Sequence, residues 1–214
     1  MDKNQIQNDI AKRVAQELEN GQYINLGIGL PTKVADYVPE NINVSFHAEN
    51  GFIGLGPAPD ENNIDPTIVN AGGQPSSILP GGAFFDSATS FGIVRGGHLD
   101  MTILGALQVD EKGNIANYMI PGKLVPGMGG AMDLLIGAKK VIVAMEHTAK
   151  GSHKILKECN LPLTAPNCVS LIVTEMAVIE VTPKGLLLKE LRNGYSFEEV
   201  QAATEAELIY NKES

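Results

Sequence analysis

The stretch from Asn43 to Pro59 constrains the fold of this chain more than any other. Its first half alternates apolar and polar side chains as far as His47, which is typical of a half-buried β-strand. Glycines and prolines crowd its second half, so we expect neither a helix nor a regular strand after Glu49. A carboxylate therefore lies where a strand gives way to a glycine-rich loop. Open α/β sheets build their active sites at such places.

Glu49 itself admits two interpretations. An isolated Glu at a strand end is most often a surface charge. The nearby glycines Gly51, Gly54 and Gly56 favour a carboxylate that another backbone or a ligand approaches closely, because side chains are missing there. The residues alone thus make Glu49 a candidate nucleophile or base.

Hydrophobic periodicity predicts an α/β fold with an open mixed sheet flanked by helices, in a single domain of residues 1–214. The apolar run from Val141 to Ala144 is typical of a strand covered on both faces. The expected helices span residues 6–18, 31–37, 87–94, 131 onward and 196–208. The expected strands span residues 23–26, 42–48, 68–71, 99–104, 107–109, 115–118, 140–145, 169–174, 178–181 and 186–191, with an irregular excursion over residues 72–82.

Two further glycine-rich turns are candidates for binding an anion. Gly27 and Gly29 lie between a predicted strand and a predicted helix, but the third glycine of a dinucleotide-binding fingerprint is missing, and tight packing is the first interpretation. The second turn, from Pro126 to Leu134, enters a predicted helix. Its backbone N–H groups would form an oxyanion or phosphate cradle. A close contact between helix and sheet would explain the glycines equally well if the chain had no Glu49.

Composition excludes several functional classes. The formal net charge of -9 argues against nucleic acid as a partner. No apolar run approaches the roughly 20 residues of a membrane helix, and the N-terminus lacks the apolar region of a secretory signal, so we expect no membrane association and a cytoplasmic location. The histidines lack zinc-like spacing, and Cys159 and Cys168 fit no metal or disulfide pattern, so no metal site is expected.

Several motifs, taken together and in order, are those of a known family. They are Asn25–Thr32, Glu49–Gly51, Val69–Gly73, Arg95–His98, Gly105–Asp110, Gly113–Asn117 and Gly127–Leu134. The chain resembles, over essentially its whole length, the B (beta) subunit of the two-subunit family I CoA transferases, of the 3-oxoacid and butyrate-acetoacetate type. One departure is Ala48, because the family usually has Ser immediately before its catalytic Glu.

This resemblance implies a fold of the sugar-phosphate isomerase and CoA transferase type and a ping-pong reaction. Glu49 would attack an acyl-CoA, such as acetyl-, butyryl- or succinyl-CoA, and pass through a glutamyl-CoA thioester before CoA moves to a short-chain carboxylic or 3-oxo acid such as acetoacetate. CoA is then a substrate and covalent intermediate, and no tightly bound cofactor is expected. An A (alpha) subunit would complete the pocket, in a heterotetramer.

The resemblance also distributes roles over the glycine-rich loops. Backbone N–H groups of Gly129, Gly130 and Ala131 are the candidate oxyanion donors, and one such donor contributes roughly 3 kcal/mol to a transition state. The candidate residues for the substrate and CoA loops are Asn50, Gly51, Gly27, Gly29, Gly72 and Gly73.

Two other functional classes remain open at this point. A sugar-phosphate isomerase would use Glu49 as a general base, and it would need Lys and Arg side chains for a phosphate around Gly27 and Gly29, where only Lys33 lies near. A non-catalytic regulatory subunit would have no use for a Glu between two glycine-rich loops.

Overall fold

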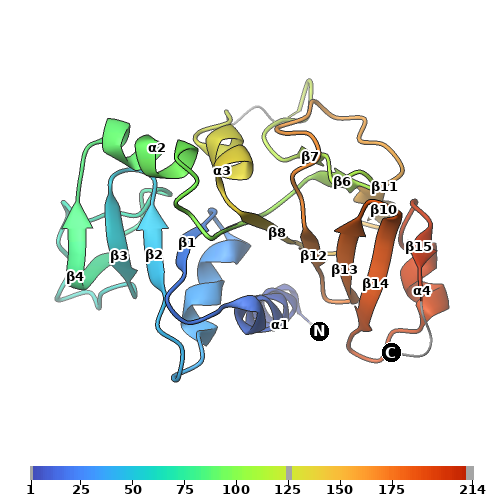
Figure 1. The fold of residues 1–214 in the computed structure, drawn as a ribbon. Helices are drawn as coiled ribbons and strands as arrows, with labels where there is room; N and C mark the ends of the chain where they lie inside the picture. Colours follow the sequence, from blue (N-terminus) through green and yellow to red (C-terminus); the bar gives the residue numbers. More distant parts are fainter. Residues whose placement is uncertain (1, 124–126, 211–214) are drawn as a thin grey trace.

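Ten strands form one continuous sheet in the computed structural model, which describes residues 2–123 and 127–210. Their order is β15-β14-β13-β12-β8-β5-β1-β2-β3-β4 (Figure 1). The five strands from β12 to β2 in this order run parallel, and β3, β4 and β13 are antiparallel to their neighbours. Strand β14 is antiparallel to β13 but parallel to β15, so the sheet is open and mixed as the sequence predicts. The strands are β1 (Tyr23–Leu26), β2 (Ser45–Ala48), β3 (Phe52–Gly56), β4 (Ser77–Phe84), β5 (Met101–Leu104), β8 (Lys140–Ala144), β12 (Leu171–Val173), β13 (Ala177–Thr182), β14 (Gly185–Leu191) and β15 (Leu208–Ile209).

Both faces of the central strands are buried, as the apolar run in β8 predicts. Val141 and Val143 belong to one core cluster, whereas Ile142 and Ala144 belong to another on the opposite face. The helices are α1 (Lys3–Val14), η1 (Ala15–Glu17), η2 (Leu30–Tyr37), α2 (Ser87–Arg95), α3 (Ala131–Gly137) and α4 (Phe197–Ala202), where η denotes a 3-10 helix. In the described part of the chain, none of them has the length and hydropathy that crossing a bilayer would require.

Helix α1 covers one face of the sheet. It begins with a capping box, in which the Asp2 side chain accepts from the Gln5 N–H and the Gln5 side chain accepts from the Asp2 N–H. Ile10, Ala11 and Val14 are fully buried and pack in the cluster that contains the inner residues of β1, β5 and β8. This helix thus supports the strands that lie beside Glu49.

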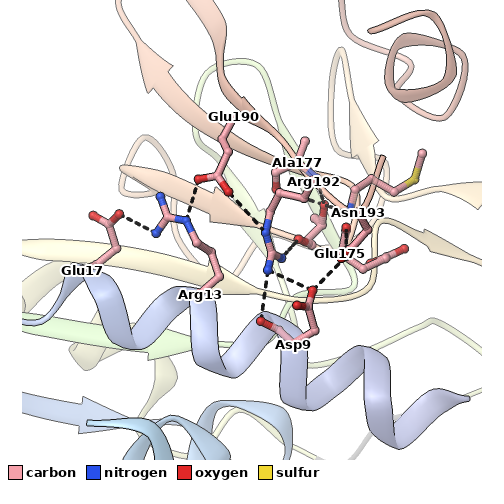
Figure 2. A network of polar contacts seen from close by, with 10 residues as sticks. Asp9, Arg13, Glu17, Glu175, Ala177, Glu190, Arg192 and Asn193 are labelled. Carbon is pink, nitrogen blue, oxygen red and sulfur yellow. Dashed lines mark hydrogen bonds and ion pairs between the residues drawn. The ribbon is translucent and has the colours of Figure 1, made fainter. Parts of the chain in front are cut away.

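A network of ion pairs joins α1 to the C-terminal hairpin (Figure 2). Arg192, which directly follows β14, is 9% exposed and pairs with Asp9 Oδ2 at 2.9 Å. Arg13 pairs with Glu17 at 2.9 Å and with Glu190 at 2.7 Å. We call these five residues, Asp9, Arg13, Glu17, Glu190 and Arg192, the α1 clamp. They fix the N-terminal helix to the antiparallel strands at the far end of the sheet.

The prediction that no regular strand follows Glu49 is wrong, because Phe52–Gly56 forms β3. Gly54 has a φ of +88°, and the register against β4 shifts between Ile53 and Leu55. A Cβ added to Gly54 would lie 2.8 Å from the Gly82 Cα. The glycine therefore makes a bulge that lets two strands approach closely, rather than ending the strand.

The segment between residues 68 and 84 also differs from its prediction. The expected strand over residues 68–71 is only an isolated bridge between Val69 and Pro75. The Asn70 side-chain oxygen instead accepts from the backbone N–H groups of Gly72 and Gln74, which closes a turn. The expected excursion over residues 72–82 becomes regular from Ser77, where β4 begins. As an edge strand, β4 tolerates a proline, because that position needs no second ladder partner.

Two predictions in the C-terminal half need smaller corrections. The hairpin over residues 107–118 forms, but its strands β6 (Gln108–Asp110) and β7 (Ile115–Ala116) belong with β11 (Ile155–Leu156) to a separate sheet, and β9 (Thr148–Ala149) pairs only with β10 (Ser152–His153). The last helix ends at Ala202 instead of continuing to residue 208. The Gln201 side chain donates to the Ala206 carbonyl and accepts from the Leu208 N–H, which redirects the chain into β15.

The parallel strands all end at one edge of the sheet, and this edge positions the candidate site. Glu49 directly follows β2, and Gly27 directly follows β1. Helices α2 and α3 pack against each other beside this edge (Figure 1). The loop that enters α3 lies in the described residues from Gly127 onward, whereas Pro126 lies outside them.

Candidate active site

Glu49 is held by a buried amide from the neighbouring strand. Asn25 of β1 is fully buried, and its Nδ2 donates to Glu49 Oε2 at 3.0 Å. The Thr102 hydroxyl of β5 donates to the Asn25 Oδ1 at 3.3 Å, which fixes the orientation of the amide. Since β1 pairs in parallel with both β2 and β5, these three residues lie on adjacent strands near their carboxyl ends. The carboxylate thus has a fixed neutral donor on one oxygen.

A second set of contacts holds the backbone of Glu49. The Ser90 hydroxyl of α2 donates to the Glu49 carbonyl oxygen at 2.9 Å, and Ser90 Oγ lies 3.0 Å from His47 Nε2. His47 is 1% exposed, and its burial lowers the pKa of the imidazole to about 4. The ring is therefore neutral at physiological pH.

Helix α2 brings the glycine-rich loop before α3 against the carboxylate. Gly130 is the N-cap of α3, and a Cβ added to it would lie 3.0 Å from Phe91 Cζ and 3.5 Å from Glu49 Cγ. Arg95, one turn beyond Phe91, pairs with Asp133 of α3 at 2.6 Å. The two regions that the sequence singles out, the Glu49 loop and the loop before α3, are thus adjacent.

The three candidate backbone donors of this loop differ in their environment. The Ala131 N–H donates to the Met128 carbonyl at 3.2 Å, so it is already engaged within the loop. Gly130 lies against the Glu49 side chain. This arrangement favours Gly129 and Gly130 over Ala131 as groups that face a reacting oxygen.

The residues after Glu49 have a packing role that the structure makes explicit. Gly51 has a φ of +133°, and an added Cβ would collide with the Phe85 carbonyl oxygen. The Gly51 carbonyl also accepts from the Phe85 N–H at 2.9 Å. The Asn50 side chain donates to the Val69 carbonyl at 2.8 Å, which ties the Glu49 turn to the segment before Gly72.

The other candidate glycines separate into two groups. Gly27 packs tightly, since an added Cβ would lie 2.6 Å from Leu104 Cδ2 and 3.2 Å from the Ile103 carbonyl oxygen. A Cβ added to Gly72 would lie 3.5 Å from Ile28 Cγ1, so the turn after β1 and the Gly72 turn meet through the Ile28 side chain. Added Cβ atoms at Gly29 and Gly73 would meet no atom within 4 Å. Those two positions are therefore open to a ligand.

A cavity of about 430 Å³ lies beside Glu49. This volume is in the usual range of small-molecule sites. Its wall is largely apolar, and most of it comes from the ends of β1, β2 and β3 and from the segment that carries Gly72. Residues in this wall include Leu26, Ile28, Ala48, Leu55, Pro57 and Pro75. Ala48, the departure from the expected Ser, is 3% exposed and belongs to this wall.

Lys33 is the basic residue that lies near Gly27 and Gly29 in the sequence, and its side chain is already hydrogen-bonded within the protein. Lys33 contributes to the cavity wall, but its Nζ donates to Asn4 Oδ1 at 2.8 Å and to Asn8 Oδ1 at 2.9 Å. Asp36 lines the same wall. No Arg lies among the described residues of this wall, so the cluster of cations that a sugar phosphate would require is not formed.

Sequence reasoning missed three residues of this site: Asn25, His47 and Ser90 in their supporting roles. Asn25 carried a usable signal, because it is a polar residue between apolar neighbours in a predicted strand, and a buried polar group needs partners. Ser90 carried none, since it lies in an ordinary amphipathic helix. Among the described residues, no group of three or more His, Cys, Asp or Glu side chains is placed to hold a metal ion.

Comparisons by sequence agree on one family. The family model described as Coenzyme A transferase matches residues 7–203. The chain is 56% identical to the beta subunit of the acetate CoA-transferase of Escherichia coli K12, over 92% of this chain and 90% of that protein. It is 50% identical to the B subunit of the succinyl-CoA:3-ketoacid coenzyme A transferase of Helicobacter pylori, over 92% of this chain and 96% of that protein.

Solved structures with the same fold include an acyl-CoA transferase. The thioester complex of the acyl-CoA transferase YdiF from Escherichia coli O157:H7 with CoA matches at a TM-score of 0.76 and 22% identity. The match covers 97% of this chain but spans only 42% of the length of that protein. At this identity the likeness concerns the fold.

Proposed function

The chain belongs to the coenzyme A transferase family, and on that premise we propose that Glu49 is the nucleophile that carries CoA between two carboxylic acids. The observation that carries the proposal is the position of its carboxylate. It is held on one oxygen by Asn25, lies beside the 430 Å³ cavity, and has Gly130 against its Cγ.

The proposed reaction balances without a further reactant. The Glu49 carboxylate attacks the acyl-CoA carbonyl and expels CoA thiolate, which gives a mixed anhydride. The thiolate then attacks the glutamyl carbonyl, releases the first carboxylate and leaves a glutamyl-CoA thioester. A second carboxylate attacks this thioester and expels the thiolate, which gives a second mixed anhydride. The thiolate then attacks the new acyl carbonyl, forms the new acyl-CoA and releases the Glu49 carboxylate. The acyl bond energy is conserved because each intermediate is itself an activated acyl group.

Two kinds of oxyanion arise in this sequence, and the site offers different donors for them. When thiolate attacks the glutamyl carbonyl, charge develops on a former carboxylate oxygen. Asn25 Nδ2 already lies 3.0 Å from Glu49 Oε2, so it supports that oxygen. When Glu49 attacks the acyl-CoA, charge develops on the substrate oxygen. The backbone N–H groups of Gly129 and Gly130 are the proposed donors there.

Water is the competing nucleophile, because it would hydrolyse the anhydride. The apolar cavity wall supports its exclusion on one side. Ile28, Phe84 and Ile136 nevertheless expose 69%, 61% and 66% of their surface. Relatives are named as beta or B subunits, so we assign the missing cover to an A (alpha) subunit in a heterotetramer. A cytoplasmic location is part of the same proposal.

The names of the relatives bound the substrates. One is named as an acetate CoA-transferase and another as a succinyl-CoA:3-ketoacid transferase. For this chain we propose acetyl-, butyryl- or succinyl-CoA as donor, and a short-chain carboxylic or 3-oxo acid such as acetoacetate as acceptor. The isomerase alternative lacks support, because Lys33 is the single Lys or Arg in the described cavity wall and binds Asn4 and Asn8.

The test is the covalent intermediate itself. The complex with the partner subunit, incubated with an acyl-CoA and no acceptor acid, should acquire CoA on this chain. Hydroxylamine should release it, and peptide mapping should locate it at Glu49. Glu49→Ala should form none, and Glu49→Asp should form it far more slowly, since the carboxylate is withdrawn by one methylene. CoA on another residue, or turnover by Glu49→Ala, would contradict the proposal.

A further inference from the structure

Ser90 joins the backbone of Glu49 to a histidine inside the molecule. It belongs to α2, is completely buried, and donates its hydroxyl hydrogen to the Glu49 carbonyl oxygen at 2.9 Å. That hydrogen is thus used, so Ser90 Oγ must accept from His47 Nε2, which lies 3.0 Å away. The imidazole therefore carries its hydrogen on Nε2.

The other ring nitrogen of His47 is turned to the amide that holds the carboxylate. Asn25 Nδ2 can only donate, and it lies 3.5 Å from His47 Nδ1, 3.2 Å from the His47 carbonyl oxygen and 3.0 Å from Glu49 Oε2. The two hydrogens of the Asn25 amide serve the two shorter contacts, and His47 Nδ1, which carries no hydrogen in the Nε2–H tautomer, lies at the outer limit of hydrogen-bond distance from this amide. The ring also stacks on Phe85 at 6.1 Å between centroids and 16° between planes.

Both ends of Glu49 are therefore connected to His47, each through one intermediate residue. Ser90 links the His47 ring to the Glu49 main-chain carbonyl, and Asn25 links the His47 carbonyl oxygen to the Glu49 carboxylate. We infer that His47 and Ser90 are positioning residues, which fix the main-chain and side-chain orientation of Glu49 for attack on the acyl carbonyl. This inference rests on the proposed function of Glu49.

The contacts of His47 and Ser90 with Glu49 should affect the rate of the reaction rather than the binding of acyl-CoA. His47 belongs to the cavity wall, but it is 1% exposed and its Nε2 bonds Ser90 Oγ, which is itself fully buried, so neither atom is free to bind a substrate. Nucleophilic attack requires the reacting atoms to be in near contact, and a displacement of about 1 Å can cost roughly 100-fold in rate. Loss of either residue should thus slow the formation of the covalent intermediate while acyl-CoA binding is kept.

The experiment uses the complex with its partner subunit and measures the single-turnover rate of CoA attachment, kcat and the KM for acyl-CoA. Ser90→Ala and His47→Leu should each reduce the attachment rate and kcat by about 10-fold to 100-fold, with KM changed by less than about threefold. His47→Gln should keep at least about a third of the wild-type rate, because a Gln amide still donates to Ser90. The double variant His47→Leu/Ser90→Ala should be about as slow as the slower single variant, since both interrupt one connection.

A matched control separates positioning from general core damage. His147 is also fully buried and bonded to two hydroxyls, those of Thr174 and Thr204, at 2.9 Å each, but it lies outside the Glu49 network. His147→Gln should lower thermal stability without changing the attachment rate of the folded complex.

If wild type forms the CoA adduct and Ser90→Ala forms it equally fast, or if His47→Gln is as slow as His47→Leu, the inference is overturned and the proposed function stands. If wild type forms no adduct, both fail together.

Discussion

Two polar networks hold different parts of the sheet, and they differ in whether their groups are charged or neutral. The α1 clamp pairs its charges with one another: Arg192 binds Asp9, and Arg13 binds Glu17 and Glu190 (Figure 2). The Glu49 network uses neutral groups, an amide, an imidazole and a hydroxyl, which lead to a single carboxylate. Among residues 2–123 and 127–210, no basic side chain forms an ion pair with that carboxylate.

This difference separates a structural network from a reactive one. A carboxylate paired with Arg is stabilised as a charge and is a poor nucleophile, because attack would have to break the pair. A carboxylate held by a neutral donor keeps its orientation and retains lone pairs for attack. The clamp should therefore govern stability and leave the rate unchanged, whereas the Glu49 network should govern the rate. The predictions below test this separation, from the largest expected effect to the smallest.

The largest effect should come from Glu49→Gln, which replaces the reacting oxygen by an amide of the same shape. The Gln side-chain oxygen can still accept from Asn25, so the free energy of unfolding should change by less than about 0.5 kcal/mol. Turnover in the complex should fall by at least roughly 1,000-fold, because the nucleophile is lost. Steady-state transfer assays and thermal unfolding measure the two quantities. A large loss of stability in this variant would show that Glu49 is also a structural residue.

The α1 clamp should give the opposite result. Arg192→Met leaves the Asp9 carboxylate with the Asn193 amide but without its cationic partner, and it removes the donor to the Thr174 carbonyl, which Arg192 Nη1 contacts at 2.5 Å. The free energy of unfolding should drop by about 3 kcal/mol, as expected when one partner of a largely buried ion pair is removed. Urea unfolding of the chain measures this, and kcat per folded molecule should stay at the wild-type value.

Lys189→Met is the matched control for the clamp. Lys189 lies in β14, close in sequence to Arg192, and its pair with Glu180 at 3.3 Å is half exposed, with 52% and 44% of the side chains accessible. An exposed pair of this kind contributes about 0.5 kcal/mol or less. Equal losses for Arg192→Met and Lys189→Met would mean that the clamp is no more important than an ordinary surface pair.

Much of the sheet could be predicted from the sequence, and the two networks could not. Apolar runs such as Val141 to Ala144 identify buried parallel strands, because cover on both faces leaves no polar position. Glu49 at the end of β2 follows from the same logic. The bond between Asn25 and Glu49, in contrast, depends on β1 pairing with β2 in one register. Local sequence does not specify which strands become neighbours.

The errors in the predicted elements have a common cause. From the sequence pattern, Gly54 is expected to end a strand. In the structure it forms a bulge that permits close contact between strands, so the sequence does not predict β3 and β4. Residues Ile68 to Ala71 are apolar enough for a strand, but the Asn70 side chain closes a turn there. In both places a single residue's backbone or side chain overrides the periodic pattern.

Lowering the pH should destabilise the protein through the buried His147 side chain. Burial, with smaller contributions from the charges of His153 and Lys154, lowers the pKa of His147 to about 4 from its ordinary 6.5. The unfolded chain therefore binds the proton more readily, and stability present above pH 6.5 is lost as the pH falls towards 4. This residue alone should contribute a loss of about 2 kcal/mol between pH 7 and pH 5.

The difference between wild type and His147→Gln measures that contribution, because the carboxylates titrate in both proteins. Urea unfolding at pH 7, 6 and 5 should show a shallower decline for the variant, although its stability at pH 7 is lower. Parallel declines would mean that the His147 environment does not disfavour the proton.

The smallest loss of turnover should come from Gly130→Ala, which tests whether the loop before α3 acts on the reaction or only packs. Gly130 has a φ of −85°, so Ala fits its backbone, whereas Gly129 has a φ of +54° and any variant there would also strain the loop. The added methyl would lie 3.0 Å from Phe91 Cζ, so the ring would have to shift by a few tenths of an ångström, and 3.5 Å from Glu49 Cγ, where it would fill the space beside the nucleophile in ordinary contact. We expect turnover to fall about tenfold, equivalent to about 1.4 kcal/mol in the barrier, with little change in the unfolding midpoint.

Gly92→Ala, in the same helix as Phe91 but with no atom within 4 Å of the added methyl, should keep turnover and slightly raise stability. A normal rate for Gly130→Ala would restrict the Glu49 network to Asn25, His47 and Ser90 and leave the loop a packing element, since the loop would then tolerate a methyl group against the nucleophile.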